Sequence, residues 1–276
     1  MNSAPLDLRD DPAATRDPAS RVLEPQVMCR DACSGRPDDL DPDHRLITIT
    51  GGDLWARAEA FVYEMYVKIG YTEPSQMHRV EELVKYTDRS RFHAVVDGRD
   101  TIIGTIRTIF GSYHELPVSQ FERTDRLDPD PVCEFSSLVV DHTVRSTGVI
   151  EHLYRAAWLD AWRSGSQAVV ALIDEWLLEC FLDTYHLPFR AIGVGREYMG
   201  GAPVPVGMPL RGPAYEGLAE ANSEFWLWTL EAVTPEELRD WHLPLVLLES
   251  PTAPQVDLPD LATPTAGGTT RVDQAR

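Results

Sequence analysis

Apolar and polar positions follow two different periods along the middle of the chain, and each period predicts one kind of element. The run LITIT at residues 46–50 alternates and is rich in β-branched side chains, which predicts a strand. From Asp53 to about Ile69 apolar residues instead recur every three or four positions, which predicts a helix with one buried face. We expect Asp53 to be the N-cap of this helix and Gly70 to end it.

A hairpin is the clearest local signal. Residues 91–110 form two β-type runs on either side of Asp97–Gly98, a pair typical of tight hairpin turns. The same criteria predict further strands at 132–141 and 167–173, helices at 149–164 and 176–185, and a closing hairpin of 189–195 with 203–210. This order of elements favours an α/β (α+β) fold, in which a mixed central sheet carries helices on both faces.

The two ends of the chain lack this patterning. Residues 1–44 and 251–276 are poor in large apolar side chains, so they bury too little surface to offset the entropy of ordering. We therefore expect a disordered acidic N-terminal arm, a folded domain at 45–213 and a disordered tail. Between domain and tail, residues 214–250 are expected to form a helical extension packed on the domain.

The extension is rich in tryptophan. Phe225, Trp226 and Trp228 cluster in SEFWLWTLEAV, and Thr234 with Glu237 matches a capping box at the start of another helix. Three roles are open for the extension besides packing on the sheet. It would wall a pocket, close over a cleft or form a dimer interface.

The charge balance limits the partners. The chain has 44 acidic and 25 basic residues, a formal net charge of −19, and such a surface repels nucleic acids and anionic membranes. No stretch approaches the ~20 apolar residues of a membrane span, and the N-terminus does not resemble a secretory signal. The expected location is the cytoplasm.

Four cysteines in 276 residues do not indicate a disulfide framework. Cys29 and Cys33 lie four residues apart with His44 further on, and a metal site would need more ligands at better spacing. We read the two as free thiols in a flexible arm and expect no metal.

Several segments occur in an order that points to a family. They are the hairpin strand IIGTIRTIF (102–110), a loop with LPVSQF (116–121), the strand EFSSLVV (134–140), the helix end YVKIGY (66–71) and the closing FRAIGVGREYMGGAPVPVGMPL (189–210). Together they resemble the GNAT superfamily, in the branch of autoinducer (acyl-homoserine-lactone) synthases and N-acyl amino acid synthases. The resemblance covers about residues 50–210. It implies a splayed central sheet and transfer of an acyl group from a thioester to an amine.

The resemblance implies acyl carrier protein or coenzyme A as the acyl donor, and no redox cofactor. Three alternatives stay open: an ordinary acetyl-CoA-dependent acetyltransferase, an aminoacyl-tRNA donor, and a catalytically inactive domain that binds a ligand or partner. A homodimer is compatible with each of them. Arg145, Arg155 and Arg163 would form a basic cluster for an acidic carrier protein.

The chain also departs from the autoinducer synthases. Their Arg in the first helix is replaced by the segment Phe61–Tyr63, and of their two Asp residues only Asp88 is present. Their Glu-x-x-Arg strand motif keeps Glu134 but has Ser137 in place of the Arg. An amino acid or related amine is therefore a better acceptor candidate than S-adenosylmethionine.

Two charged residues in apolar strands are the catalytic candidates. Glu134 begins a strand between Cys133 and Phe135, where desolvation would raise the pKa of its carboxyl and suit it to act as general base or amine anchor. Arg107 lies in an apolar run, where an unpaired guanidinium is costly. It would bind the acceptor carboxylate or else pair with Glu134 or Asp88.

The remaining candidates bind substrate or donor. Asp88, Ser136, Ser137 and Tyr66 are candidates for substrate binding, with turn capping and ordinary strand packing as the alternatives for the first three. Arg145 and Gly148 belong to an imperfect form of the GNAT phosphate loop, in which Ile150 replaces a small residue. They are candidates for binding the donor's phosphate.

Overall fold

The computed structural model describes residues 37–125, 130–141, 143 and 148–245. Within this part of the chain a mixed sheet has the strand order β1-β2-β3-β4-β5-β7-β6. All neighbours pair antiparallel except β4 and β5, which are parallel. The strands are β1 (Arg45–Ile49), β2 (Ser90–Val96), β3 (Ile102–Gly111), β4 (Val132–Val140), β5 (Ala168–Ile173), β6 (Arg190–Ala191) and β7 (Val204–Pro209).

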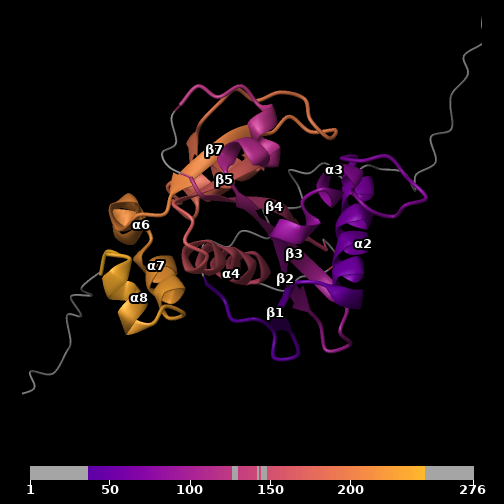
Figure 1. Ribbon diagram of the computed structural model, residues 1–276. Coiled ribbons are helices and arrows are strands. Elements are labelled where there is room, and N and C mark those ends of the chain that lie inside the picture. The colour runs from indigo at the N-terminus through magenta and orange to yellow at the C-terminus, as the bar shows by residue number, and fades with distance from the viewer. Residues whose placement is uncertain (1–36, 126–129, 142, 144–147, 246–276) are drawn as a thin grey trace, which may run out of the picture. The chain divides into compact units, whose positions relative to one another are not determined.

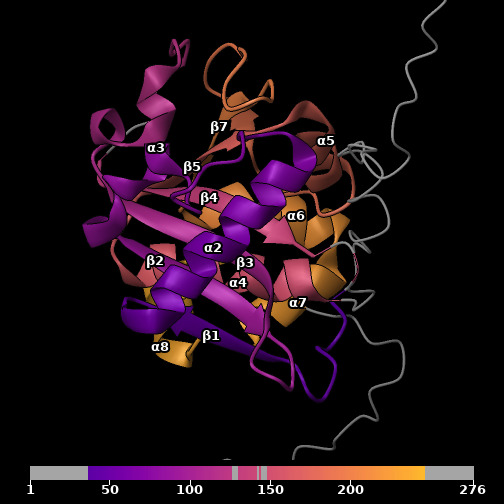
Figure 2. The ribbon, with the colours of Figure 1, turned by 90° about the vertical axis from the view of Figure 1, so that its right-hand side faces the viewer.

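Helices cover both faces of the sheet, as the order of elements predicts (Figures 1 and 2). One face carries α2 (Gly52–Ile69), α3 (Glu81–Val84) and the short turns η1 (Thr87–Arg89), η2 (Tyr113–Glu115) and η3 (Pro117–Gln120). The other face carries α4 (Val149–Arg163), α5 (Glu175–Asp183), η4 (Gly212–Tyr215), α6 (Glu216–Ala221), α7 (Ser223–Leu230) and α8 (Pro235–Asp240). We call them the α2 face and the α4 face.

Local boundaries follow the sequence with two corrections. The N-cap of α2 is Gly51 and not Asp53. Asp53 lies in the first turn, where its negative charge interacts favourably with the positive end of the helix dipole. Gly70 ends α2 in the left-handed conformation, as expected. The hairpin turn is longer than a two-residue turn, because the Asp97 carboxylate accepts hydrogen bonds from the backbone N–H groups of Arg99 and Thr101.

The central sheet opens between β4 and β5. Their pairing runs only from Val132 opposite Ala168 to Phe135 opposite Ala171, although β4 continues to Val140. Beyond Phe135, β5 pairs with β7 alone. β4 also changes register against β3 at Ser137, a bulge residue with a left-handed φ of 51°. The strands therefore splay apart from Phe135 onward, which leaves strand backbone without a partner on that side.

One carboxylate fastens α4 to the sheet. Asp160 accepts hydrogen bonds from Thr108 at 2.9 Å and from His93 at 3.2 Å, and it pairs with Arg91. Burial alone would raise the pKa of Asp160, but these hydrogen bonds and the charge of Arg91 bring it below its usual value. The other ring nitrogen of His93 meets Thr48 at 3.1 Å, so His93 is a satisfied core residue.

The C-terminal helices pack on α4 through aromatic rings. Trp158 of α4, which is fully buried, contacts Tyr215, Trp226 and Trp241 at centroid distances of 5.7 to 6.1 Å. The predicted capping box of Thr234 is present at the start of α8.

Replacing Asp160 with Ala should lower the free energy of unfolding by about 3–5 kcal/mol, because it leaves His93, Thr108 and Arg91 without their shared partner. Urea denaturation measures this change. Asp183→Ala, at the exposed end of α5, is the matched control and should change stability by less than about 0.5 kcal/mol. A loss for Asp160→Ala no larger than that of the control would show that α4 is held by its apolar contacts alone.

Candidate functional site

The candidate site lies on the α2 face, where β4 and β5 begin to separate. Glu134 points into this face from the position just before Phe135, and only 2% of its surface is exposed. One carboxyl oxygen accepts a 2.9 Å hydrogen bond from the Val118 backbone N–H. No described residue donates to its other oxygen, which retains a small accessible area.

Burial dominates the protonation of Glu134. Desolvation raises the pKa of its carboxyl to about 8, and the single N–H donor of Val118 offsets only part of that rise. At neutral pH the carboxyl is therefore mostly protonated. A group whose pKa lies near the working pH suits proton transfer to and from an amine.

Two tyrosines flank this carboxyl. The Tyr113 hydroxyl is buried and has no hydrogen-bond partner in the described chain, while its ring lies 4.5 Å below the Arg123 guanidinium. Burial raises the pKa of both Tyr113 and Tyr198, and the charge of Glu134 raises each further. Tyr198, in the loop between β6 and β7, packs edge-on against Phe121 at 5.6 Å.

A second set of polar side chains lies around the β4 bulge at Ser137. A side-chain hydrogen bond with Ser137 and the charge of Arg107 lower the pKa of Tyr66, but burial outweighs them and raises it. Asp174, directly after β5, also acts on Tyr66 and accepts a hydrogen bond from Tyr71. The Ser137 carbonyl accepts from the Thr105 hydroxyl at 3.2 Å, which holds the bulge in place.

Asp174 is tied to several elements. Burial raises the pKa of Asp174, against hydrogen bonds from Ala202 and Trp176 that lower it. The structure thus brings Tyr66, Ser137 and Arg107 together, as the sequence candidates require. Ser136 lies beside them, with its hydroxyl 3.4 Å from that of Ser137.

Arg107 is enclosed rather than open to a ligand. It is 1% exposed, its guanidinium lies 5.3 Å from the rings of Trp55 and Phe92, and it donates to the Leu83 carbonyl at 3.1 Å. Desolvation lowers the pKa of Arg107 to about 10. Of the two alternatives for Arg107, the ion pair with Glu134 or Asp88 does not form among the described residues; aromatic faces and a carbonyl surround the charge instead.

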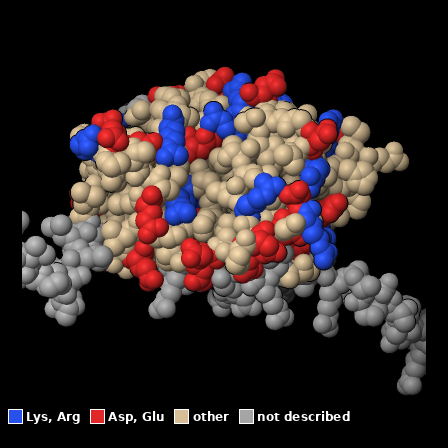
Figure 3. All heavy atoms as spheres, turned by 90° about the horizontal axis from the view of Figure 1, so that it is seen from below, with Lys and Arg blue, Asp and Glu red and all other residues tan. Residues whose placement is uncertain are grey.

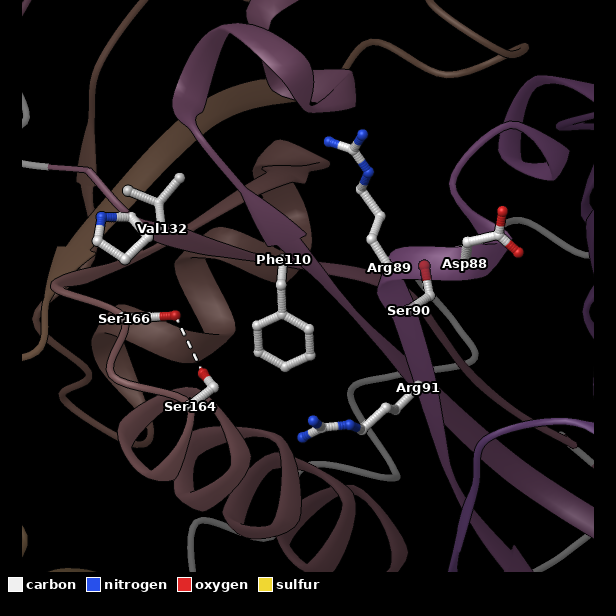
Figure 4. A pocket seen from close by; sticks show the side chains of 9 residues that line it. Asp88, Arg89, Ser90, Arg91, Phe110, Val132, Ser164 and Ser166 are labelled. Atoms are coloured by element: carbon white, nitrogen blue, oxygen red, sulfur yellow. Dashed lines mark hydrogen bonds between the residues drawn. The ribbon is translucent and has the colours of Figure 1, made fainter.

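Asp88 lies elsewhere. It lines a hollow of ≈ 300 Å³ together with Arg89, Arg91 and Phe110, and Glu134 is not part of that lining. In Figure 4 the Asp88 carboxylate points away from Phe110, and the two guanidinium groups lie on opposite sides of that ring. The two arginines are engaged with Glu115 and Asp160. The structure therefore separates Asp88 from the other candidates.

The candidates for donor binding are only partly visible. Arg145 lies outside the described residues. Gly148 is the N-cap of α4 with a left-handed φ of 83°, and a Cβ there would lie 2.3 Å from the Asp38 carbonyl oxygen. The acidic segment that precedes β1 thus packs against the first turn of α4.

Two of the three arginines expected to receive a carrier protein are engaged within the described chain. Arg155 lies 3.6 Å from the Trp228 ring and donates to the Trp228 carbonyl, and Arg163 pairs with Glu237 at 2.8 Å. Figure 3 shows acidic and basic side chains interspersed on the face seen from below. These two arginines therefore join α4 to the C-terminal helices.

Two further findings concern the described residues only. None of their helices is long and apolar enough to cross a membrane. They also contain no group of three or more His, Cys, Asp and Glu side chains arranged to hold a metal ion.

Sequence reasoning did not single out Asp174, Tyr113 or Tyr198. Asp174 had a usable signal, because a polar residue directly after a buried strand lies at the strand end where a splayed sheet opens. The two tyrosines had none, because loops far apart in the sequence bring them to Glu134.

Comparisons with known proteins identify the family and the fold of this chain. The family model for the N-acyl amino acid synthase FeeM matches residues 57–198. No curated protein sequence matches the chain.

Among solved structures, the chain is similar to a CoA-dependent acyl-homoserine lactone synthase, BjaI, with MTA (16% identity, 65% of this chain and 90% of that one, TM-score 0.51). It is also similar to the AHL synthase LasI (9% identity, 64% and 94%, TM-score 0.51). FeeM from uncultured soil microbes also matches (15% identity, 62% and 92%, TM-score 0.47). The similarity to BjaI and LasI shows the GNAT-like fold that the motifs predict.

The raised pKa of Glu134 makes stability depend on pH. Its folded-state value of about 8 lies above the ordinary 4.5, so the folded protein holds a proton that the unfolded chain releases between these values. This contribution is fully present below pH 4.5 and is lost as the pH rises through 8.

Glu134→Gln keeps the hydrogen bond from Val118 and has no proton to lose. Its free energy of unfolding should therefore gain on the wild type by up to about 1.4 kcal/mol per pH unit between pH 5 and 8. Urea denaturation of both proteins at each pH measures the difference. A constant difference across this range would place the carboxyl in water rather than in the core.

Proposed function

Because this chain belongs to the family of the N-acyl amino acid synthase FeeM and is an acyltransferase that draws on a thioester donor, we propose that its acceptor is the amine of an amino acid or related small molecule. The observation that carries this proposal is Glu134, a buried carboxyl with a pKa of about 8 and one oxygen open on the α2 face. An amine must lose a proton to attack a thioester, and this group has the place and the proton affinity to accept it.

The splayed strands provide the second requirement. As the amine attacks, the thioester oxygen gains negative charge, which backbone N–H groups stabilise. β4 beyond Phe135 has no strand partner on its β5 side, so its backbone is free to receive a thioester there. The bulge at Ser137 turns the chain at this point, and Thr105 fixes it.

The reaction then needs no nucleophilic side chain. The amine nitrogen forms a bond to the thioester carbon, the carbon–sulfur bond breaks, and the proton from nitrogen passes to Glu134, directly or through a water molecule. The leaving thiolate takes up a proton in turn, from Glu134 or from solvent. Holding the amine and the thioester side by side along one strand accounts for much of the rate enhancement.

Other residues of the site have supporting roles in this proposal. Tyr66 and the hydroxyls of Ser136 and Ser137 orient the acceptor at the bulge, and Asp174 attracts its positive charge. Arg107 positions α2 and α3 against the sheet, because its guanidinium contacts Trp55 and Phe92 and donates to the Leu83 carbonyl, although its Nε has no partner among the described residues.

The donor is an acyl thioester on coenzyme A or on a carrier protein. Arg145 and Gly148 remain the proposed contacts for its phosphate. An acidic carrier protein finds two of the three expected arginines already engaged, which favours coenzyme A or a donor that approaches from another side.

Glu134→Gln should lower kcat/KM by about 10²–10⁴-fold, because it removes the proton acceptor and keeps the shape of the side chain. Purified protein incubated with amino acids and acyl thioesters, followed by intact mass spectrometry, detects and quantifies the N-acyl product. In the wild type kcat/KM should rise with pH towards about 8, as Glu134 ionises.

The matched control is Glu220→Gln, an isosteric change of an exposed carboxylate on α6. It should leave kcat/KM within about threefold. Full activity of Glu134→Gln would sink the assignment of the base. Absence of N-acyl product from wild-type protein with every donor would sink the proposed acceptor class.

A further inference from the structure

We propose that residues 37–44 form an autoinhibitory strap, which lies against the first turn of α4 and holds phosphate-bearing donors away from it. The inference rests on the proposed function, in which Gly148 is a contact for the donor's phosphate. A donor such as an acyl-CoA then binds only to those molecules in which the strap has left α4, so the docked strap weakens its apparent affinity.

The strap meets the start of α4 through its backbone. The Asp38 carbonyl oxygen lies 2.3 Å from the place that a Cβ on Gly148 would take, and the Asp39 carbonyl oxygen lies 3.5 Å from it. The backbone of Asp38 also forms a hydrogen bond with His152, one turn into the helix. The space beside Gly148 is therefore filled by carbonyl oxygens of the chain itself, which suit the positive end of a helix dipole.

The strap also brings negative charge to this end of α4. Burial lowers the pKa of His152, and the charge of Asp39 opposes that effect. Burial likewise lowers the pKa of Arg155, and the charges of Glu231 and Asp39 oppose it. Asp39 is therefore near enough to act on both basic side chains, and its charge repels a phosphate that approaches them.

Leu40 anchors the strap. Its side chain is partly buried and packs against the core of the α4 face, whereas Asp39 beside it is exposed. Towards β1 the strap ends in a turn, in which the His44 N–H donates to the Asp41 carbonyl at 2.8 Å. Figure 1 shows this indigo start of the described chain passing alongside α4. One partly buried leucine and a few polar contacts make a weak attachment, so a ligand with comparable binding energy can displace the strap.

The test compares donors with and without phosphate. Isothermal titration calorimetry gives the Kd of coenzyme A. Turnover with one amino acid acceptor gives kcat/KM for acetyl and octanoyl groups, each carried on coenzyme A and on pantetheine. Pantetheine has the same thiol arm but lacks the nucleotide and all phosphates, so the comparison isolates the part of the donor that the strap repels.

Leu40→Ser removes the anchor and should tighten coenzyme A binding about three- to tenfold, because the strap then leaves α4 more often. Its kcat/KM should rise by the same factor with acyl-CoA and should stay within about twofold of the wild type with acyl-pantetheine, which carries no charge for the strap to repel.

Asp39→Asn keeps the anchor and removes one exposed charge, so it cannot fail for want of packing. It should tighten coenzyme A binding about two- to threefold, and this gain should shrink in about 0.5 M salt. Asp240→Asn is the matched control, because it removes an exposed charge from α8, which pairs with the opposite end of α4 at Arg163. It should leave the Kd unchanged.

Failure of the inference and failure of the proposed function give different results. If folded Leu40→Ser and Asp39→Asn bind coenzyme A no more tightly than the wild type, the inference is overturned, and N-acyl product from any donor leaves the proposed function standing. An equal gain with acyl-pantetheine also overturns the inference, since the strap would then act regardless of phosphate. Tighter coenzyme A binding in both variants without N-acyl product from any donor supports the strap and overturns the proposed function.

Discussion

The arrangement of this site depends on the point at which β4 and β5 stop pairing. Four residues of each strand pair in parallel, and the last of these pairs joins Phe135 to Ala171. Three polar residues of the candidate site lie within a few residues of that point. Glu134 precedes it, the Ser137 bulge follows it, and Asp174 comes directly after β5. A continuous ladder would have spent the same backbone groups on ordinary hydrogen bonds. The helices of the α2 face and of the α4 face cover the sheet on either side of this opening.

Two carboxyls on opposite faces of the sheet, the partly buried Asp160 and the buried Glu134, have opposite pKa shifts. Asp160 on the α4 face has His93, Thr108 and Arg91 as partners and keeps its negative charge. Glu134 on the α2 face has a single N–H donor and gains a proton affinity close to neutral pH. The number of hydrogen-bond donors and nearby charges explains why the pKa of Asp160 is lowered and that of Glu134 is raised. Arg107 shows a third solution, in which aromatic faces and one carbonyl surround the guanidinium, and the charge of Glu59 raises its pKa against the effect of burial.

The sequence predicted the element order well because the periodicities of 46–50, 53–69 and 149–164 are strong, and each element appears within one or two residues. It placed Glu134 and Arg107 in apolar strands, and the structure finds both buried. It left the partner of Arg107 open, and among the described residues Arg107 pairs with neither Glu134 nor Asp88, because register and helix packing decide which side chains meet. The first strand of the closing hairpin, predicted at 189–195, is only the two residues of β6, because apolar composition does not distinguish an edge strand from a packed loop. The second strand, β7, appears as predicted. Tyr113 and Tyr198 reach Glu134 only through tertiary folding.

Gly148 illustrates how a motif residue can owe its identity to more than one cause. Its left-handed backbone and the Asp38 carbonyl oxygen 2.3 Å from the place of a Cβ would each exclude most side chains. A glycine at this position is thus required by the chain's own fold, whether or not a phosphate ever lies beside α4. A sequence motif that uses this glycine to recognise donor binding therefore combines two separate requirements, one of the donor site and one of the backbone. In a related protein that no longer bound the donor, the steric requirement alone would still preserve a glycine at this position.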